Sequence, residues 1–185
     1  LRKAFSEINA YPSLESIAYT RSDSKRILWT DEIFMHAVAR DDFSINPIGV
    51  QEVLERLRNS GDISQEEHDS YIAKLLGWNY SVIYWNADVA FAAAKLSNWD
   101  ATIFPFTGVI RQFQSTHWTL DEKCKLASRL LLKVYYSRAG HIQESSILVN
   151  VLNAIGDLRT ADVIRQHLAP ECTTDKGLKR SMEIS

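Results

Sequence analysis

One stretch constrains the fold of this chain more than any other, the run RILWTDEIFMHAVAR from Arg26 to Arg40. A short apolar segment in it ends at Thr30, Asp31 and Glu32, and a segment with helical apolar spacing follows at once. This pattern predicts a buried strand that ends in two adjacent carboxylates and passes into a helix. Ligands bind at the carboxyl ends of strands in open α/β sheets, and paired carboxylates bind hard cations such as Mg²⁺. The stretch therefore predicts an α/β fold and a place for a metal.

The same two acids also have a purely structural interpretation. Asp31 and Glu32 lie in the first turn of the predicted helix, where a carboxylate interacts favourably with the positive end of the helix dipole. Helix starts favour Asp and Glu whether or not a ligand binds there. The pattern alone leaves both the catalytic and the structural interpretation open.

The segments after this helix complete a predicted βαβ unit. Residues 43–46 alternate apolar and polar side chains, which predicts a second short strand, and a strand, a helix and a strand over this length form a right-handed crossover. Gly49 then opens an amphipathic helix that Gly61 ends. A second helix ends at Gly77, so the two form an αα-hairpin, which is too acidic to rest on phosphates and is expected to pack against the fold.

The remainder of the chain changes from mixed to helical patterning. Residues 79–86 carry aromatic and β-branched side chains on both alternating faces and are interpreted as a strand or extended segment. From about residue 101 only helical spacing is found, with a capping box at Thr119 and Glu122. We therefore expect a helix-rich α/β region over residues 1–100 that lacks its first strand, an all-α extension over 101–170, and a flexible tail over 171–185.

Composition excludes several classes of protein. A formal net charge of -2 over 185 residues argues against a protein that coats nucleic acid by bulk electrostatics. Cys124 and Cys172 stand far apart without a partner at metal-ligand spacing, which favours a reducing compartment. The sequence contains no apolar run of membrane-spanning length and no signal peptide, so we expect a cytoplasmic protein. Its first residues, LRKAF, already have helical character, and we expect a fragment or a processed piece of a larger protein.

Several short motifs follow one another between Ile27 and Asp100. They are LWTDE, a helix with Ala37 and Arg40, a short strand, Gly49-Val50, Val53-Leu54, Gly61, Ile63, and the acidic hairpin followed by Gly77-Trp78-Asn79-Tyr80. In this order they resemble the carboxyl-terminal half of a PIN-like nuclease domain, as found within large bacterial multidomain proteins. The resemblance implies a partial PIN-like parallel sheet.

The resemblance also implies an activity and a site. PIN-like nucleases hydrolyse phosphodiester bonds of RNA or single-stranded nucleic acid, and converging carboxylates hold the Mg²⁺ or Mn²⁺ that activates the attacking water. Asp31 and Glu32 correspond to metal ligands, and Thr30 to an orienting hydroxyl. The family's first acid lies on an amino-terminal strand, and nothing before Arg26 has the pattern of that strand.

Three basic or titratable side chains are candidates for contacts with nucleic acid. Arg26 and Arg40 bracket the acidic turn in the sequence and could guide a polyanion to it, although ordinary solvated charge explains them equally well. His36 lies one helical turn after Glu32 and could touch a phosphate, whereas a solvated position is the more common role. The tryptophans, Trp29 among them, could stack on bases, but core anchors are the default expectation.

Two functional hypotheses follow from the sequence. The first is a PIN-like, divalent-metal-dependent endonuclease that acts on RNA or single-stranded DNA as part of a larger protein. The second is a catalytically degenerate PIN-like module whose helical surface binds a protein partner or positions neighbouring domains. Further carboxylates within metal reach of Asp31 would favour the first.

Overall fold

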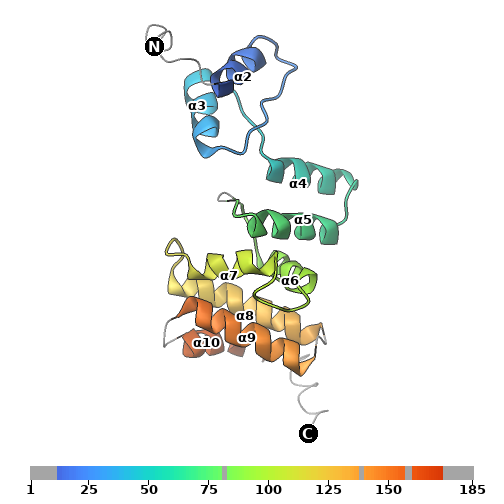
Figure 1. Cartoon of the computed structure of the whole chain (residues 1–185), viewed down its shortest axis with the longest axis vertical. Helices are drawn as coiled ribbons and strands as arrows, with labels where there is room; N and C mark the ends of the chain where they lie inside the picture. The colour runs from blue at the N-terminus through green and yellow to red at the C-terminus, as the bar shows by residue number, and fades with distance from the viewer. Residues whose placement is uncertain (1–11, 81–82, 138–139, 157–159, 173–185) are drawn as a thin grey trace. The chain divides into compact units, whose positions relative to one another are not determined.

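The computed structural model describes residues 12–80, 83–137, 140–156 and 160–172, and these residues are mostly α-helical (Figure 1). The described helices are α2 (Pro12–Arg21), α3 (Ile33–Phe43), α4 (Val50–Ser60), α5 (Gln65–Gly77), α6 (Ala87–Leu96), α7 (Phe106–Gln114), α8 (Leu120–Tyr136), α9 (His141–Ile155) and α10 (Thr160–Cys172). None of them is both long enough and apolar enough to cross a bilayer. The predicted first helix near Leu1 and nearly all of the predicted tail over 171–185 lie outside the described residues.

The predicted α/β class with a PIN-like parallel sheet is wrong for the described residues, because they contain no sheet. The predicted strand at 26–30 is an extended segment whose only pairing with the described residues is one isolated parallel bridge, between Trp29 and Ile48. Two hydrogen bonds make the bridge: Thr30 N donates to Ile48 O at 3.0 Å, and Ile48 N donates to Leu28 O at 2.9 Å. The segments therefore run in the predicted parallel sense, but they pair over too short a length to form strands.

The predicted second strand at residues 43–46 is wrong, because these residues form the end and the cap of a helix. Phe43 is the last residue of α3, and Ser44 caps the helix in the left-handed region at φ 56°. The Ser44 N–H bonds back to Arg40 O at 3.2 Å, and Ile45 N bonds to Ala39 O at 2.9 Å. These bonds use the backbone groups that a strand would need, so the apolar and polar alternation here reflects a half-buried helix end.

The predicted strand at residues 79–86 is also absent in its described part. Asn79 has φ 63°, and its N–H bonds to Leu76 O at 3.0 Å, which extends the cap of α5. At the other end, the Asn86 side chain accepts hydrogen bonds from Asp88 N and Val89 N and so begins α6. Residues 81–82 lie outside the described part of the chain.

The chain divides into two compact units, Leu1–Ser64 and Gln65–Ser185. The described part of the first unit has a small core that joins α2, the extended segment and α3. Its buried members are Ile17, Leu28, Met35 and Ala39. This division by contacts is separate from the predicted boundary at residue 100, which stays a prediction.

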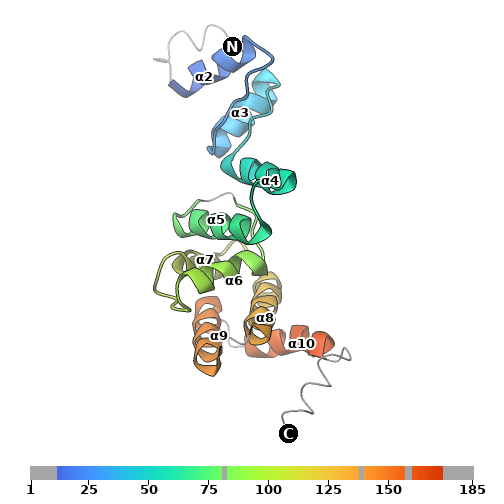
Figure 2. The same cartoon turned by 90° about the vertical axis from the view of Figure 1, so that its right-hand side faces the viewer.

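The second unit is a layered helical bundle. Figures 1 and 2 show α6 and α7 between α5 on one side and the pair α8 and α9 on the other, while α10 packs against α8. Small residues allow the close approach of these layers: Ala90, Ala93 and Ala94 of α6 are fully buried. Phe106 and Phe113 of α7 are the largest of the fully buried side chains among the described residues.

Candidate functional site

The acidic turn at Asp31 caps the start of α4, although the helix that follows it in the sequence is α3. Asp31 Oδ1 accepts a hydrogen bond of 2.7 Å from Val50 N, the first residue of α4, although 19 positions separate the two. Glu52 Oε2 accepts a second bond of 2.9 Å from Gly49 N. Two carboxylates thus satisfy free N–H groups at the positive end of α4.

Because Gly49 has no side chain, these two carboxylates can approach the first N–H groups of α4. A Cβ added at Gly49 would lie 2.8 Å from Glu52 Oε2 and 3.0 Å from Asp31 Oδ1. Both oxygens therefore occupy the space that a side chain would fill. Sequence reasoning identified Gly49 as a helix start, and the structure confirms it as the N-cap of α4, but Glu52 was not recognised as a neighbour of Asp31.

Thr30, Glu32 and His36 form a separate local network at the start of α3. Glu32 is the N-cap of α3, but its side chain makes no capping bond, and its N–H donates to Thr30 Oγ1 at 3.3 Å. His36 Nε2 lies 2.7 Å from Thr30 O. Because a carbonyl oxygen only accepts, Nε2 must carry the hydrogen. His36 therefore ties α3 to the extended segment, and Asp31 and Glu32 serve different helices.

The two candidate arginines, Arg26 and Arg40, bond to other residues of the first unit. The Arg26 guanidinium stacks over the Tyr19 ring at 3.7 Å and donates to Tyr19 O at 2.9 Å and to Ser22 Oγ at 2.7 Å. The Arg40 guanidinium donates to Asp41 Oδ1 at 2.8 Å, and this hydrogen bond and the Asp41 charge raise the pKa of Arg40. In the described part of the chain, neither arginine hydrogen-bonds to the acidic turn.

The side chains around the turn do not make up the ligand set of the predicted Mg²⁺ or Mn²⁺. Among the described residues, no three or more Asp, Glu, His or Cys side chains gather where they could hold a metal ion. Asp31 and Glu52 come close, but an oxygen of each already accepts a backbone N–H. A hard cation needs six or more oxygens around it. The predicted metal site stays a prediction, and the described residues do not complete it.

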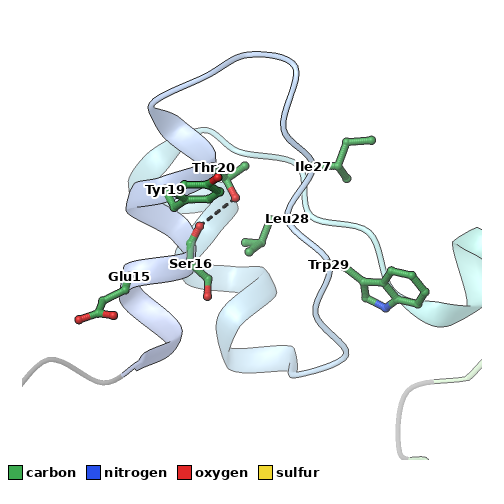
Figure 3. Close-up of a pocket in the computed structure, with 7 residues that line it drawn as sticks. All are labelled: Glu15, Ser16, Tyr19, Thr20, Ile27, Leu28 and Trp29. Carbon is green, nitrogen blue, oxygen red and sulfur yellow. Dashed lines mark hydrogen bonds between the residues drawn. The ribbon is translucent and has the colours of Figure 1, made fainter.

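A pocket of about 540 Å³ lies between α2 and the extended segment (Figure 3). Four residues of α2 line it on one side and three residues of the extended segment on the other: Glu15, Ser16, Tyr19, Thr20, Ile27, Leu28 and Trp29. Leu28 is buried and points toward α2, whereas Ile27 and Trp29 point away from it (Figure 3). The pocket thus combines an apolar wall with hydroxyl groups and one carboxylate.

Large apolar side chains are exposed around this pocket and at the start of α3. Five of these side chains are more than half exposed: Tyr19, Ile27, Trp29, Ile33 and Phe34. Trp29 is 59% exposed and Phe34 72%. Trp29 was expected to be a core anchor, and the helical apolar spacing after Glu32 predicts that Ile33 and Phe34 belong to the buried stripe of α3. The structure instead buries Met35 and Ala39, which share one face at i, i+4 spacing.

A buried polar pair in the second unit was predicted only in part. His68 and Asp69 of α5 are both buried, His68 Nδ1 lies 3.2 Å from Asp69 Oδ1, and Gln65 Nε2 donates to the same oxygen at 2.8 Å. The helical spacing of the sequence places His68 on the core side of this helix and Asp69 on the exposed acidic face of the hairpin. Its burial beside His68 is explained by this hydrogen bonding, which a helical pattern alone does not reveal.

Comparison of the chain with protein-family models, with curated proteins and with solved structures finds no match.

Proposed function

We propose that this chain is a helical protein-binding module and that its first unit supplies the binding surface. The observation that carries the proposal is the exposure of Tyr19, Ile27, Trp29, Ile33 and Phe34 near one another in the sequence. Covering a large apolar side chain contributes about 1.5–3 kcal/mol. A surface that leaves several of them in water gains free energy when a protein partner covers it.

The nuclease hypothesis receives less support from the same residues. Asp31 is engaged as a cap of α4 beside one further acid, Glu52, and Glu32 stands at the start of α3. Among the described residues, no three side chains that could hold a metal ion gather there. Arg26 is committed to Tyr19 and Ser22. Cleavage of RNA or single-stranded DNA stays an untested prediction, and we favour a protein as the partner.

We also propose that the module acts in the cytoplasm. The two cysteines of the sequence, Cys124 and Cys172, have no partner at metal-ligand spacing, which suits a reducing compartment.

Position-specific crosslinking tests the proposed function. Phe34 is replaced by a photoreactive benzoylphenylalanine, and the purified chain is irradiated in a lysate of the cells that produce it. The matched control carries the same group at Ile142 in α9, which is also highly exposed. We expect a discrete protein adduct from position 34 that is absent from position 142. Excess unlabelled wild-type chain should suppress it, whereas excess Trp29→Ser/Phe34→Ser chain should not.

Two results would contradict the proposed function. The first is equal labelling from positions 34 and 142, or no competition by the wild-type chain. The second is Mn²⁺-dependent cleavage of single-stranded RNA by the purified chain that is lost in Asp31→Asn and kept in Trp29→Ser. That pattern would restore the nuclease hypothesis.

A further inference from the structure

Three of the exposed apolar side chains of the first unit lie within one short stretch of the chain. Trp29 lies four positions before the start of α3, and Ile33 and Phe34 are the first two residues of that helix. Each of these three side chains is more than half exposed. Because a chain spans at most about 3.6 Å per residue, their Cα atoms lie within about 18 Å of one another. A standard interface covers about 800 Å² on each partner, so a single partner surface can cover all three.

Two exposed carboxylates lie inside this stretch, and they differ in what they bond to. Asp31 Oδ1 accepts a hydrogen bond from Val50 N, so the positive end of α4 compensates part of the charge of Asp31. The side chain of Glu32 makes no capping bond to α3. Among the described residues, the Glu32 carboxylate has no hydrogen bond and no ion pair. Of the two acids, Glu32 is therefore the one whose charge is open to a partner.

The arginines of this part of the chain do not neutralise Glu32. The guanidinium of Arg26 is stacked on the Tyr19 ring, and that of Arg40 donates a hydrogen bond to Asp41. The described part of the first unit carries nine Asp and Glu side chains against six Lys and Arg side chains. The exposed apolar stretch thus lies in an acidic unit, and one of its carboxylates is uncompensated there.

This charge limits what can cover the stretch. Glu32 lies between Trp29 and Ile33 in the chain, so a partner that covers both also covers or borders its carboxylate. A carboxylate taken out of water without a cation weakens binding, whereas one that faces a Lys or Arg favours the partner that carries it. Phosphates of nucleic acid or of a lipid surface are repelled. A second copy paired about a two-fold axis at this stretch would bring two Glu32 side chains together.

We propose that the partner of the first unit is a protein whose contact surface is apolar and bears a Lys or Arg side chain that pairs with Glu32. The apolar part of that surface covers Trp29, Ile33 and Phe34. This inference rests on the proposed function and names the chemistry of the partner. The three apolar side chains supply most of the affinity, and Glu32 selects among apolar surfaces.

Two synthetic helical peptides are the probes for this chemistry. They share one stripe of leucine side chains and differ only in the residues that border it, which are Lys in one peptide and Glu in the other. Their Kd for the full chain is measured by fluorescence anisotropy. We expect wild type to bind the Lys peptide at least tenfold more tightly than the Glu peptide. The Trp29→Ser/Phe34→Ser chain should bind the Lys peptide at least tenfold more weakly than wild type does, because the apolar contact is lost.

Charge reversal at Glu32 tests the pairing itself. The Glu32 side chain makes no capping bond, so Glu32→Lys leaves the bonds that hold the start of α3 in place. This variant should bind the Lys peptide at least tenfold more weakly than wild type and the Glu peptide more tightly. Glu55→Lys is the matched control, because it changes the net charge equally at an exposed residue of α4. It should leave the Kd of each peptide within twofold of the wild-type value.

Three results would overturn the inference. They are binding of neither peptide or of both equally by wild type, equal effects of Glu32→Lys and Glu55→Lys, and binding of the Lys peptide that Trp29→Ser/Phe34→Ser leaves intact. If one of these occurs while position 34 still crosslinks a competable partner, the inference of a basic partner surface fails and the proposed function stands. Loss of the crosslink as well removes both.

Discussion

Asp31 is the residue on which the catalytic and structural interpretations of the acidic turn differ. As a metal ligand it would be dispensable for folding, whereas as the acceptor for Val50 N it stabilises the start of α4. Removing a helix-capping side chain costs about 1 kcal/mol. We therefore expect Asp31→Ala to speed exchange of the Val50 amide about fivefold.

Two variants control this measurement. Glu32→Ala removes the adjacent acid, which makes no capping bond, and should leave Val50 exchange unchanged. Asp31→Asn keeps an oxygen acceptor and should recover most of the protection. Unchanged exchange in Asp31→Ala would show that the cap contributes nothing in solution.

Glu122 links the stability of α8 to pH. The backbone N–H of Thr119, and then its hydroxyl, donate to Glu122 and lower the pKa of this carboxyl below its ordinary value of 4.5. A carboxyl with a lowered folded-state pKa contributes stability above its unfolded pKa and loses it as the pH falls through the folded value. We expect Glu122→Gln to be less stable than wild type at pH 7, with the difference closing below pH about 4.5.

Thermal unfolding over this pH range checks the Glu122 prediction. Glu55→Gln removes an exposed carboxyl of α4 and should follow the wild-type profile. A constant difference between Glu122→Gln and wild type down to acid pH would contradict the capping role of the charge.

Helix ends are the elements that could be predicted from the sequence. The capping box at Thr119 and Glu122 and the left-handed caps at Gly61 and Gly156 are all present as local patterns indicate. Each depends on residues within one or two turns, so the sequence contains the whole interaction.

The strand pairing and the contacts of the acidic turn could not be predicted in the same way, because the groups that they bond to are distant in the sequence. The apolar run before Thr30 has the pattern of a buried strand, but only one bridge to Ile48 forms, and Trp29 faces solvent. The position of Asp31 at a helix start was anticipated, yet the helix that it caps is α4 rather than α3. Side-chain exposure of Ile33 and Phe34 depends on which face of α3 meets α2 and the extended segment, and period alone does not fix that face.

The contact between α5 and α7 depends on the absence of one side chain. A Cβ at Gly108 would lie 2.5 Å from Leu76 O and 2.7 Å from Gly77 N, which are backbone atoms that cannot turn away. Alanine would otherwise favour the helix by about 1 kcal/mol. We expect Gly108→Ala to destabilise the chain by about 1–3 kcal/mol instead, because the two helices must separate.

Urea unfolding followed by circular dichroism measures the Gly108 effect. Gln114→Ala at the exposed end of the same helix is the control and should change the free energy of unfolding by less than about 0.5 kcal/mol. A Gly108→Ala chain as stable as wild type would mean that α5 and α7 do not approach this closely.

At the scale of the whole molecule, the two units have different characters. The second unit has a deep core of aromatic and aliphatic side chains, whereas the described part of the first unit exposes more large apolar side chains than it buries in its core. We infer that the second unit is the stable scaffold and that the first unit carries the interaction.

The affinity of the partner crosslinked at position 34 for three full chains tests this account most directly. We measure it by isothermal titration with wild type, Trp29→Ala and Asp31→Asn. The Kd should be at least tenfold weaker for Trp29→Ala, because Trp29 lies on the proposed binding surface. It should stay within twofold of wild type for Asp31→Asn, because Asp31 caps the start of α4. An unchanged Kd for Trp29→Ala together with lost binding in Asp31→Asn would contradict it.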